Sequence, residues 1–321
     1  MKKKIKRALG ICALIGIGIV AATALFKTDH KEEYLSNNVK INGFTVSNWK
    51  KKAAFIPGDD SFSIDSANKI LAVADGVTRD PQEIVDLGTL KGKLEFAWYY
   101  PRPSPAKKAA DIFCQTFSEV LRGYNQSSRD EKAIKKAYQE ANSRIKQWNN
   151  QNMLNMDYIL NDFAGCVSSG VIEKEGVIYF GCLADCGVAI FDENGNLRFR
   201  TENQGPGKYD KYIWQDKRLQ NIDWKNPEAR EIIRKYYRNN PSEKNSYGVL
   251  TGEDAAMDYV RTGKQEIKPN EHLFVYTDGL EQAIFSNEFG NKLKEKDMKK
   301  LEKLCRQKVE TEGTLIYYTI K

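Results

Sequence analysis

Histidine is scarce in this sequence, with only two residues, His30 and His272, in a chain of 321. A zinc site therefore has few ligands to draw on, because zinc in proteins is held mainly by cysteine and histidine. No serine lies in a nucleophile-elbow motif, and two histidines leave little scope for a Ser-His-Asp triad. These absences argue against zinc enzymes and against serine hydrolases.

Cysteine is too thinly spread for a disulfide framework. Of the six cysteines, Cys12 lies in an apolar run near the N-terminus. The other five are Cys114, Cys166, Cys182, Cys186 and Cys305. An odd, scattered set in a domain of this size is typical of small buried residues.

Basic residues are not distributed as in a nucleic-acid-binding protein. The formal net charge is +7, but Lys2, Lys3, Lys4, Lys6 and Arg7 supply five of those charges. The rest of the chain has no basic stripe interleaved with aromatic residues. The sequence therefore predicts no nucleic-acid partner, and residues 1–7 are interpreted as a basic flank beside a membrane.

Residues 8–26 form an apolar run of nineteen residues without a charge. This is close to the length of about 20 residues that crosses a bilayer as a helix. With the positive charge before it, the run predicts a single-pass membrane protein, the membrane as a partner, and a cytoplasmic N-terminus. A secreted protein is the alternative, because Ala22-Thr23-Ala24 has the form of a signal-peptide cleavage site. An uncleaved anchor is favoured because the apolar run continues through Leu25 and Phe26.

The remainder is expected to form one domain, residues 41–321, behind a linker of residues 27–40. No internal repeat or low-complexity tract occurs there. The predicted strands are Ile70–Ala74, Cys166–Ile172, Val177–Leu183, Val188–Phe191, Leu273–Thr277 and Leu315–Ile320. Asn194-Gly195 between two apolar runs predicts a β-hairpin.

Three helices are predicted in the same region. Residues 113–124 and 134–148 carry apolar side chains three and four positions apart, which is the helical spacing. A further helix is predicted to begin at Pro227, with Asn226 as its cap. Strands in hairpin order with segregated helices are typical of an α+β fold with antiparallel sheets.

Carboxylates stand next to predicted strands at four places. They are Asp59 and Asp60 in "PGDDSF", Asp75-Gly76 in "LAVADG", Asp185 in "CLADCG" and Asp278-Gly279 in "VYTDGL". Each alone is more typical of a turn residue. Together, like charges at strand ends indicate a shared cation, and Mg²⁺ or Mn²⁺ suits carboxylate and carbonyl oxygens.

The order of these motifs resembles a known family. The series "GDDSF … LAVADG … GCVSSGVI … CLADCGVAIF … GVLTG … LFVYTDGL … GTLIYY" is similar to the metal-dependent protein serine/threonine phosphatases of the type 2C (PPM) family, over about Ile56 to Ile320. The resemblance implies two packed antiparallel β-sheets flanked by helices and a phosphoprotein substrate. It also implies two Mg²⁺ or Mn²⁺ ions at one end of the sheets.

The family's metal ligands carry over residue by residue. By resemblance, Asp75 would bridge the two ions, the Gly76 carbonyl would bind one, and Asp278 would bind the other. Asp59 and Asp60 would hold metal-bound water, which makes Asp60 part of the metal site. Asp185 would belong to a third, weaker site.

Two departures from the family pattern concern this site. Phe55 stands near the place of the family's phosphate-binding arginine, and Arg79 is an alternative phosphate contact. Thr311 stands where the family has its last metal-binding aspartate, so Glu310 or Glu312 is the alternative metal ligand. Of these two, Glu312 is taken as the predicted ligand. The site is therefore expected to bind one ion well and the second weakly.

Two functions remain open at this point. The first is a metal-dependent protein phosphatase, and the second is a pseudophosphatase that acts as a binding or regulatory module. Thr311 favours the second. The retained Asp60, Asp75, Asp185 and Asp278 favour the first, because a non-catalytic domain has no reason to keep mutually repelling carboxylates together.

Overall fold

The computed structural model describes most of the chain from residue 30 onward. The described residues are 30–36, 39–49, 51, 58–77, 91, 103–152, 157–160, 163–220, 222 and 227–320. Residues 1–7 and 8–26, predicted as basic flank and membrane helix, and Arg79 and Asn226 lie outside them.

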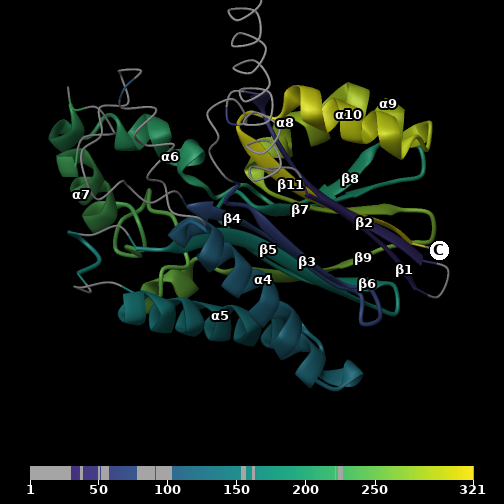
Figure 1. The fold of residues 1–321 in the computed structure, drawn as a ribbon, viewed down its shortest axis with the longest axis horizontal. Coiled ribbons are helices and arrows are strands. Elements are labelled where there is room, and N and C mark those ends of the chain that lie inside the picture. Colours follow the sequence, from purple (N-terminus) through teal and green to yellow (C-terminus); the bar gives the residue numbers. More distant parts are fainter. Residues whose placement is uncertain are drawn as a thin grey trace, which may run out of the picture.

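Two β-sheets form the centre of the molecule (Figure 1). The first has the strand order β1-β2-β11-β10-β7-β8, and the second has the order β3-β4-β5-β6-β9. Neighbouring strands are antiparallel in both. The bounds are β1 His30–Ser36, β2 Val39–Ser47, β3 Ser61–Asp65, β4 Ile70–Val77, β5 Gly165–Lys174, β6 Val177–Leu183, β7 Gly187–Phe191, β8 Leu197–Arg200, β9 Arg261–Glu266, β10 His272–Tyr276 and β11 Glu312–Thr319. The predicted antiparallel α+β fold and the β7–β8 hairpin are confirmed.

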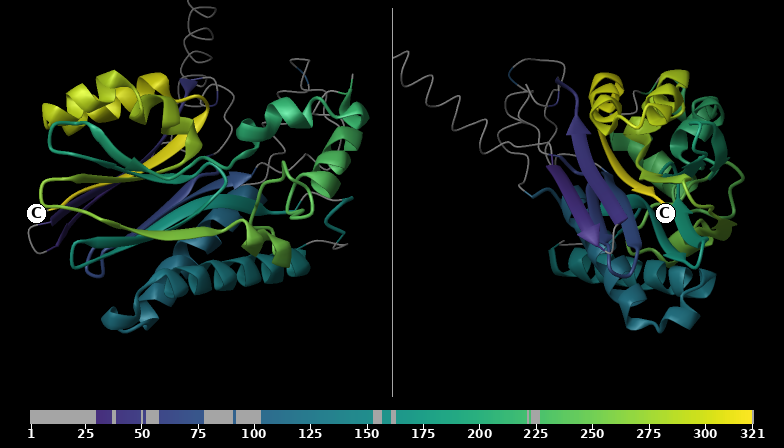
Figure 2. Two further views of the ribbon diagram at one scale, coloured as in Figure 1. Left: turned by 180° about the vertical axis from the view of Figure 1, so that it is seen from behind. Right: turned by 90° about the vertical axis from the view of Figure 1, so that its right-hand side faces the viewer.

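Helices cover the outer faces of the two sheets (Figures 1 and 2). α4 and α5 lie on the second sheet, and α8, α9 and α10 lie on the first. The bounds are α4 Pro105–Gly123, α5 Glu131–Asn152, α6 Pro206–Ile213, α7 Pro227–Tyr236, α8 Glu281–Ile284, α9 Asn287–Lys294 and α10 Met298–Lys308. Short 3₁₀ turns occupy η1 Gln126–Ser128, η2 Lys217–Leu219, η3 Asp254–Asp258 and η4 Asp278–Leu280.

Strand β4 is buried on both of its faces, which explains its uninterrupted apolar sequence. Side chains alternate across a strand. Leu71 and Val73 therefore face the first sheet, in the core between the sheets. Ile70, Ala72 and Ala74 face the helices instead. The two cores hold β4 firmly, and its last residues come to the edge where the acids gather.

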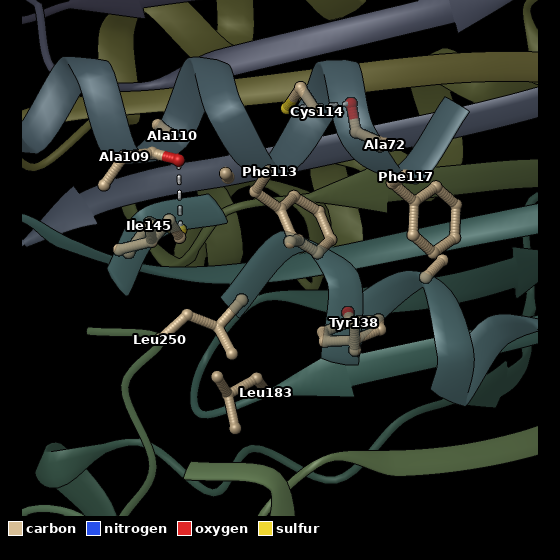
Figure 3. Packing of buried hydrophobic residues seen from close by; sticks show 14 of the residues in the cluster. Ala72, Ala109, Ala110, Phe113, Cys114, Phe117, Tyr138, Ile145, Leu183 and Leu250 are labelled. Carbon is tan, nitrogen blue, oxygen red and sulfur yellow. Dashed lines mark hydrogen bonds between the residues drawn. The ribbon is translucent and has the colours of Figure 1, made fainter. Parts of the chain in front are cut away.

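The helix-side core is built on aromatic contacts between α4 and α5. In Figure 3, Phe113 and Phe117 point from α4 toward Tyr138 of α5. The ring centroids of Phe113 and Tyr138 are 5.0 Å apart, and those of Phe117 and Tyr138 are 5.9 Å apart. Cys166 donates from Sγ to the Ala109 carbonyl at 3.6 Å (Figure 3). The five cysteines expected to be buried thiols are free and buried.

The membrane topology expected from the sequence is corrected. Within the described part of the chain, no helix combines the length and the apolar character needed to span a bilayer. The single-pass assignment, and the secreted alternative derived from the same run, are therefore not kept. In addition, β1 lies within residues 27–40, where a linker was expected, because it pairs with β2 along its whole length.

Candidate active site

The ends of several strands open into one pocket of about 380 Å³. Asp59 and Asp60 stand immediately before β3, Asp75 lies near the end of β4, and Asp185 lies in the turn between β6 and β7. All four line this pocket, together with Gly76. The first residue of η4, Asp278, is close enough to interact electrostatically with Asp75 and Asp185. The structure thus brings together the five aspartates that the sequence analysis singled out.

The two Asp-Gly motifs need glycine because other backbone segments press against them. A Cβ on Gly76 would lie 2.6 Å from the Ala106 carbonyl oxygen, at the start of α4. A Cβ on Gly279 would lie 1.7 Å from the Glu312 carbonyl oxygen. No real Cβ fits at these distances. The glycines therefore allow α4 and β11 to close on the strand ends that carry Asp75 and Asp278.

A set of hydroxyl groups fixes the first acid pair. Thr277 donates from Oγ1 to Asp60 Oδ2 at 2.8 Å, and it accepts from the Thr314 amide at 2.8 Å. Ser104, which caps α4, donates to Asp59 Oδ1. Sequence reasoning missed Thr277 and Ser104 in this role. The available signal was position, because Thr277 directly precedes the Asp-Gly motif.

The carboxylates destabilise one another in their charged forms. Burial, with repulsion from Glu312, raises the pKa of Asp60 to about 7. Burial, with repulsion from Asp278, raises the pKa of Asp185 to about 7. Burial and the charges of Asp60 and Asp278 raise the pKa of Asp75 well above its ordinary value. Burial also raises the pKa of Asp278. Such shifts arise where charge is buried without a compensating cation.

One oxygen of Glu312, the alternative metal ligand, is engaged elsewhere, whereas its buried Oε1 has no hydrogen-bond partner among the described residues. Its Oε2 accepts from Lys51 Nζ at 2.6 Å and from the Asp59 amide at 2.8 Å. Burial alone would lower the pKa of Lys51, but the charges of Glu312 and Asp59 raise it above its ordinary value. Glu312 therefore anchors the loop before β3 and pairs with an ammonium group. The exposed Glu310 accepts from Gln282 Nε2 on α8.

A divalent cation fits this donor set by charge, on one side of the pocket. Asp185 Oδ1 is a buried oxygen without a hydrogen-bond partner among the described residues. A cation near Asp60, Asp75, Asp185 and Asp278 would relieve both this orphaned oxygen and the mutual repulsion. Among the same described residues, however, no three His, Cys, Asp or Glu side chains already have metal-binding geometry. Binding would require the carboxylates to close around the ion.

A second ion does not fit equally well. Thr311 lines the pocket but offers only a neutral hydroxyl group. Its neighbour Glu312 is already paired with Lys51. The Glu312 carboxylate therefore offers a second ion mainly its Oε1, the oxygen that has no hydrogen-bond partner among the described residues.

Comparison with known proteins shows a similarity of fold but no sequence match. No family model and no curated protein matches this chain. The solved structures do match. The Mycobacterium tuberculosis serine/threonine phosphatase PstP aligns with a TM-score of 0.56 at 10% identity, covering 88% of this chain and 99% of PstP. This chain has the fold of the PPM-type serine/threonine phosphatases.

Two further structures agree with that assignment. RsbX, crystallised with magnesium, aligns with a TM-score of 0.51 at 11% identity, covering 91% of this chain and all of RsbX. PppA from Pseudomonas aeruginosa aligns with a TM-score of 0.54 at 10% identity, covering 91% of this chain and 96% of PppA. PstP has also been crystallised with two manganese ions. At these identities the likeness is one of fold.

Proposed function

We propose that this chain is a metal-dependent phosphatase that hydrolyses phosphoserine or phosphothreonine in proteins. The observation that carries the proposal is the gathering of Asp60, Asp75 and Asp185 in one pocket. Asp278 lies close enough to repel Asp75 and Asp185, and burial and repulsion raise the pKa values of these carboxylates. The PPM-type fold supports the reaction class. Mg²⁺ and Mn²⁺ both suit an all-oxygen donor set.

Some residues of the site would hold the ion, and others would orient water. When bound, a divalent cation activates water and neutralises charge on a phosphoryl group. Asp75, Asp278 and the Gly76 carbonyl would hold the ion. Asp59 and Asp60 would orient water, with Asp60 kept in place by the Thr277 hydroxyl group at 2.8 Å.

A non-catalytic binding module is the second candidate. It is favoured by the second ion's side of the pocket, where Thr311 is neutral and Glu312 pairs with Lys51. A pocket that holds one ion could bind a phosphorylated segment without hydrolysing it.

A metal titration with Asp75→Asn tests the enzyme. The full chain, stripped with EDTA, is expected to gain activity on a phosphothreonine peptide as Mg²⁺ or Mn²⁺ is added. Asp75→Asn should lower kcat/KM at least about 100-fold, because even the loss of an outer-shell partner costs a metal site about 10- to 100-fold. Metal binding by calorimetry should weaken in parallel.

Asp254→Asn is the matched control. Asp254 is exposed on η3 and pairs with Lys146 at 3.4 Å, so the same chemical change should leave activity intact. If the parent binds metal and phosphopeptide but shows no turnover at any metal concentration, the binding module replaces the enzyme.

A further inference from the structure

Three arginines form a second, oppositely charged side of the same pocket. Arg230 and Arg234 lie four residues apart on α7, and Arg238 follows another four residues later, just beyond the helix end. Positions four apart share one face of a helix. All three line the pocket that contains Asp60 and Asp75. Figures 1 and 2 show α7 beyond one end of the two sheets, away from the C-terminus.

The structure holds two of these guanidinium groups in place with backbone carbonyls. Arg234 donates from Nε to the Ile159 carbonyl at 2.6 Å and from Nη2 to that of Leu160 at 3.3 Å. Arg238 donates from Nη2 to the Tyr158 carbonyl at 3.0 Å. These contacts orient the two guanidinium groups.

Carboxylates also lie near this row of arginines, and hydrogen bonds from backbone amides, together with the charge of Arg234, lower the pKa of Asp157. Arg238 Nη2 lies 3.7 Å from Glu253 Oε2. At Arg230, burial and the charge of Arg234 lower the pKa to about 10. The group stays protonated at neutral pH, but its neighbours disfavour that charge. A bound anion would relieve this repulsion, just as a cation would relieve the carboxylates across the pocket.

We propose that Arg230, Arg234 and Arg238 form an oxyanion-binding wall that receives the phosphoryl oxygens of a phosphate monoester. This inference deepens the proposed phosphatase function and rests on it. The guanidinium fork suits a phosphoryl group, because it places parallel N–H donors against two oxygens. The wall also supplies positive charge in a chain that has Phe55 near the position of the family's phosphate-binding arginine.

Arg230 is the residue to change, because it is half-buried, whereas Arg234 and Arg238 are buried. The probe is inorganic phosphate, titrated by calorimetry into the full chain, once with EDTA and once with Mg²⁺. Arg230→Gln is expected to raise the dissociation constant of phosphate about tenfold under both conditions, as for the loss of a charge-assisted hydrogen bond. Arg230→Lys keeps the charge but not the fork, so its affinity should lie between those of wild type and Arg230→Gln.

Lys235→Gln is the matched control. It removes one positive charge from the exposed side of the same helix and should leave phosphate affinity unchanged. Thermal melts establish that each variant is folded, and Arg230→Lys carries the test if Arg230→Gln is not. Equal phosphate affinity in wild type and both Arg230 variants, or no phosphate binding by wild type under either condition, overturns the wall.

The outcome is independent of turnover. Binding that depends on Arg230 without any hydrolysis would retain the wall and reject the enzyme. Hydrolysis by a protein whose phosphate affinity does not change in the Arg230 variants would retain the enzyme and reject the wall.

Discussion

Asp185 is presented to the pocket by a residue in an unfavourable backbone conformation. Ala184, directly before it, has a φ of 60°, in the left-handed region that glycine adopts more readily. The same residue is buried, and its carbonyl accepts from the Gln204 amide at 2.7 Å. A glycine at this position would adopt the same φ without strain.

Substitutions at Ala184 should therefore depend on backbone preference more than on size. Ala184→Gly is expected to change the free energy of unfolding by less than about 1 kcal/mol, because relief of strain offsets the lost methyl group. Ala184→Val should destabilise by about 1–3 kcal/mol, since a β-branched residue rarely adopts positive φ. Urea unfolding measures both. Equal stability of the two variants would show that the turn relaxes and that the strain is not maintained.

Single-residue signals explain what the sequence could predict of the site. An acid followed by glycine at the end of an apolar run is visible locally, and this pattern found Asp75 and Asp278. The contacts of Lys51 with Glu312 and of Thr277 with Asp60 join residues more than two hundred positions apart. Such pairs depend on how the sheets meet, so no local pattern indicates them. The Arg79 prediction remains untested, because that residue lies outside the described part of the chain.

At the level of elements, apolar runs predicted the strands that are covered on both faces. β4, β5, β6, β7, β10 and β11 all occur where such runs were found. β9 was missed because it is an edge strand of polar sequence, Arg261–Glu266, which pairs with β6 only. The basic segment of residues 292–303 is divided between α9 and α10, and Lys296 between the two helices has a φ of 55°.

His272 lies where strands β10 and β11 pair, and its titration makes the stability of the fold depend on pH. It begins β10, is buried, and lies 3.1 Å from Thr319 Oγ1 and 3.2 Å from the Tyr317 hydroxyl group, both on β11. Burial and the charge of Lys296 lower its pKa, and Asp192 and Glu271 oppose them only in part.

The sign of the pH effect follows from that depressed pKa. The folded state binds a proton less readily than the unfolded chain, so stability is present above the unfolded pKa of about 6.5 and is lost as pH falls below it. His272→Gln should remove this loss between pH 7.5 and 5.5 in urea unfolding, whereas His30→Gln should retain it. Identical pH profiles for the His272→Gln and His30→Gln variants would exclude His272 as the source.

On the scale of the whole molecule, the pocket joins the two sheets. Asp60 and Asp75 adjoin β3 and β4 of the second sheet, whereas Asp278 and Thr311 adjoin β10 and β11 of the first. A cation bound here would therefore connect both halves of the sandwich. Its binding free energy would add to global stability, by about 2.7 kcal/mol when the ion is at 100 times its dissociation constant.

Thr311→Asp tests whether the lack of a negative charge at this position limits the binding of a second cation at the pocket. Thr311 is exposed at the pocket, so a carboxylate there can reach a second ion without displacing the Lys51–Glu312 pair. We expect the Mn²⁺ concentration for half-maximal activity to fall about tenfold, because ligand charge tunes affinity for hard cations. Calorimetry should then count two ions per chain in place of one.

Thr311→Asn is the control, because asparagine has nearly the same shape as aspartate without the charge. This variant should behave like the parent. If the Asp and Asn variants give the same metal titration, the second site is limited by something other than the charge at this position.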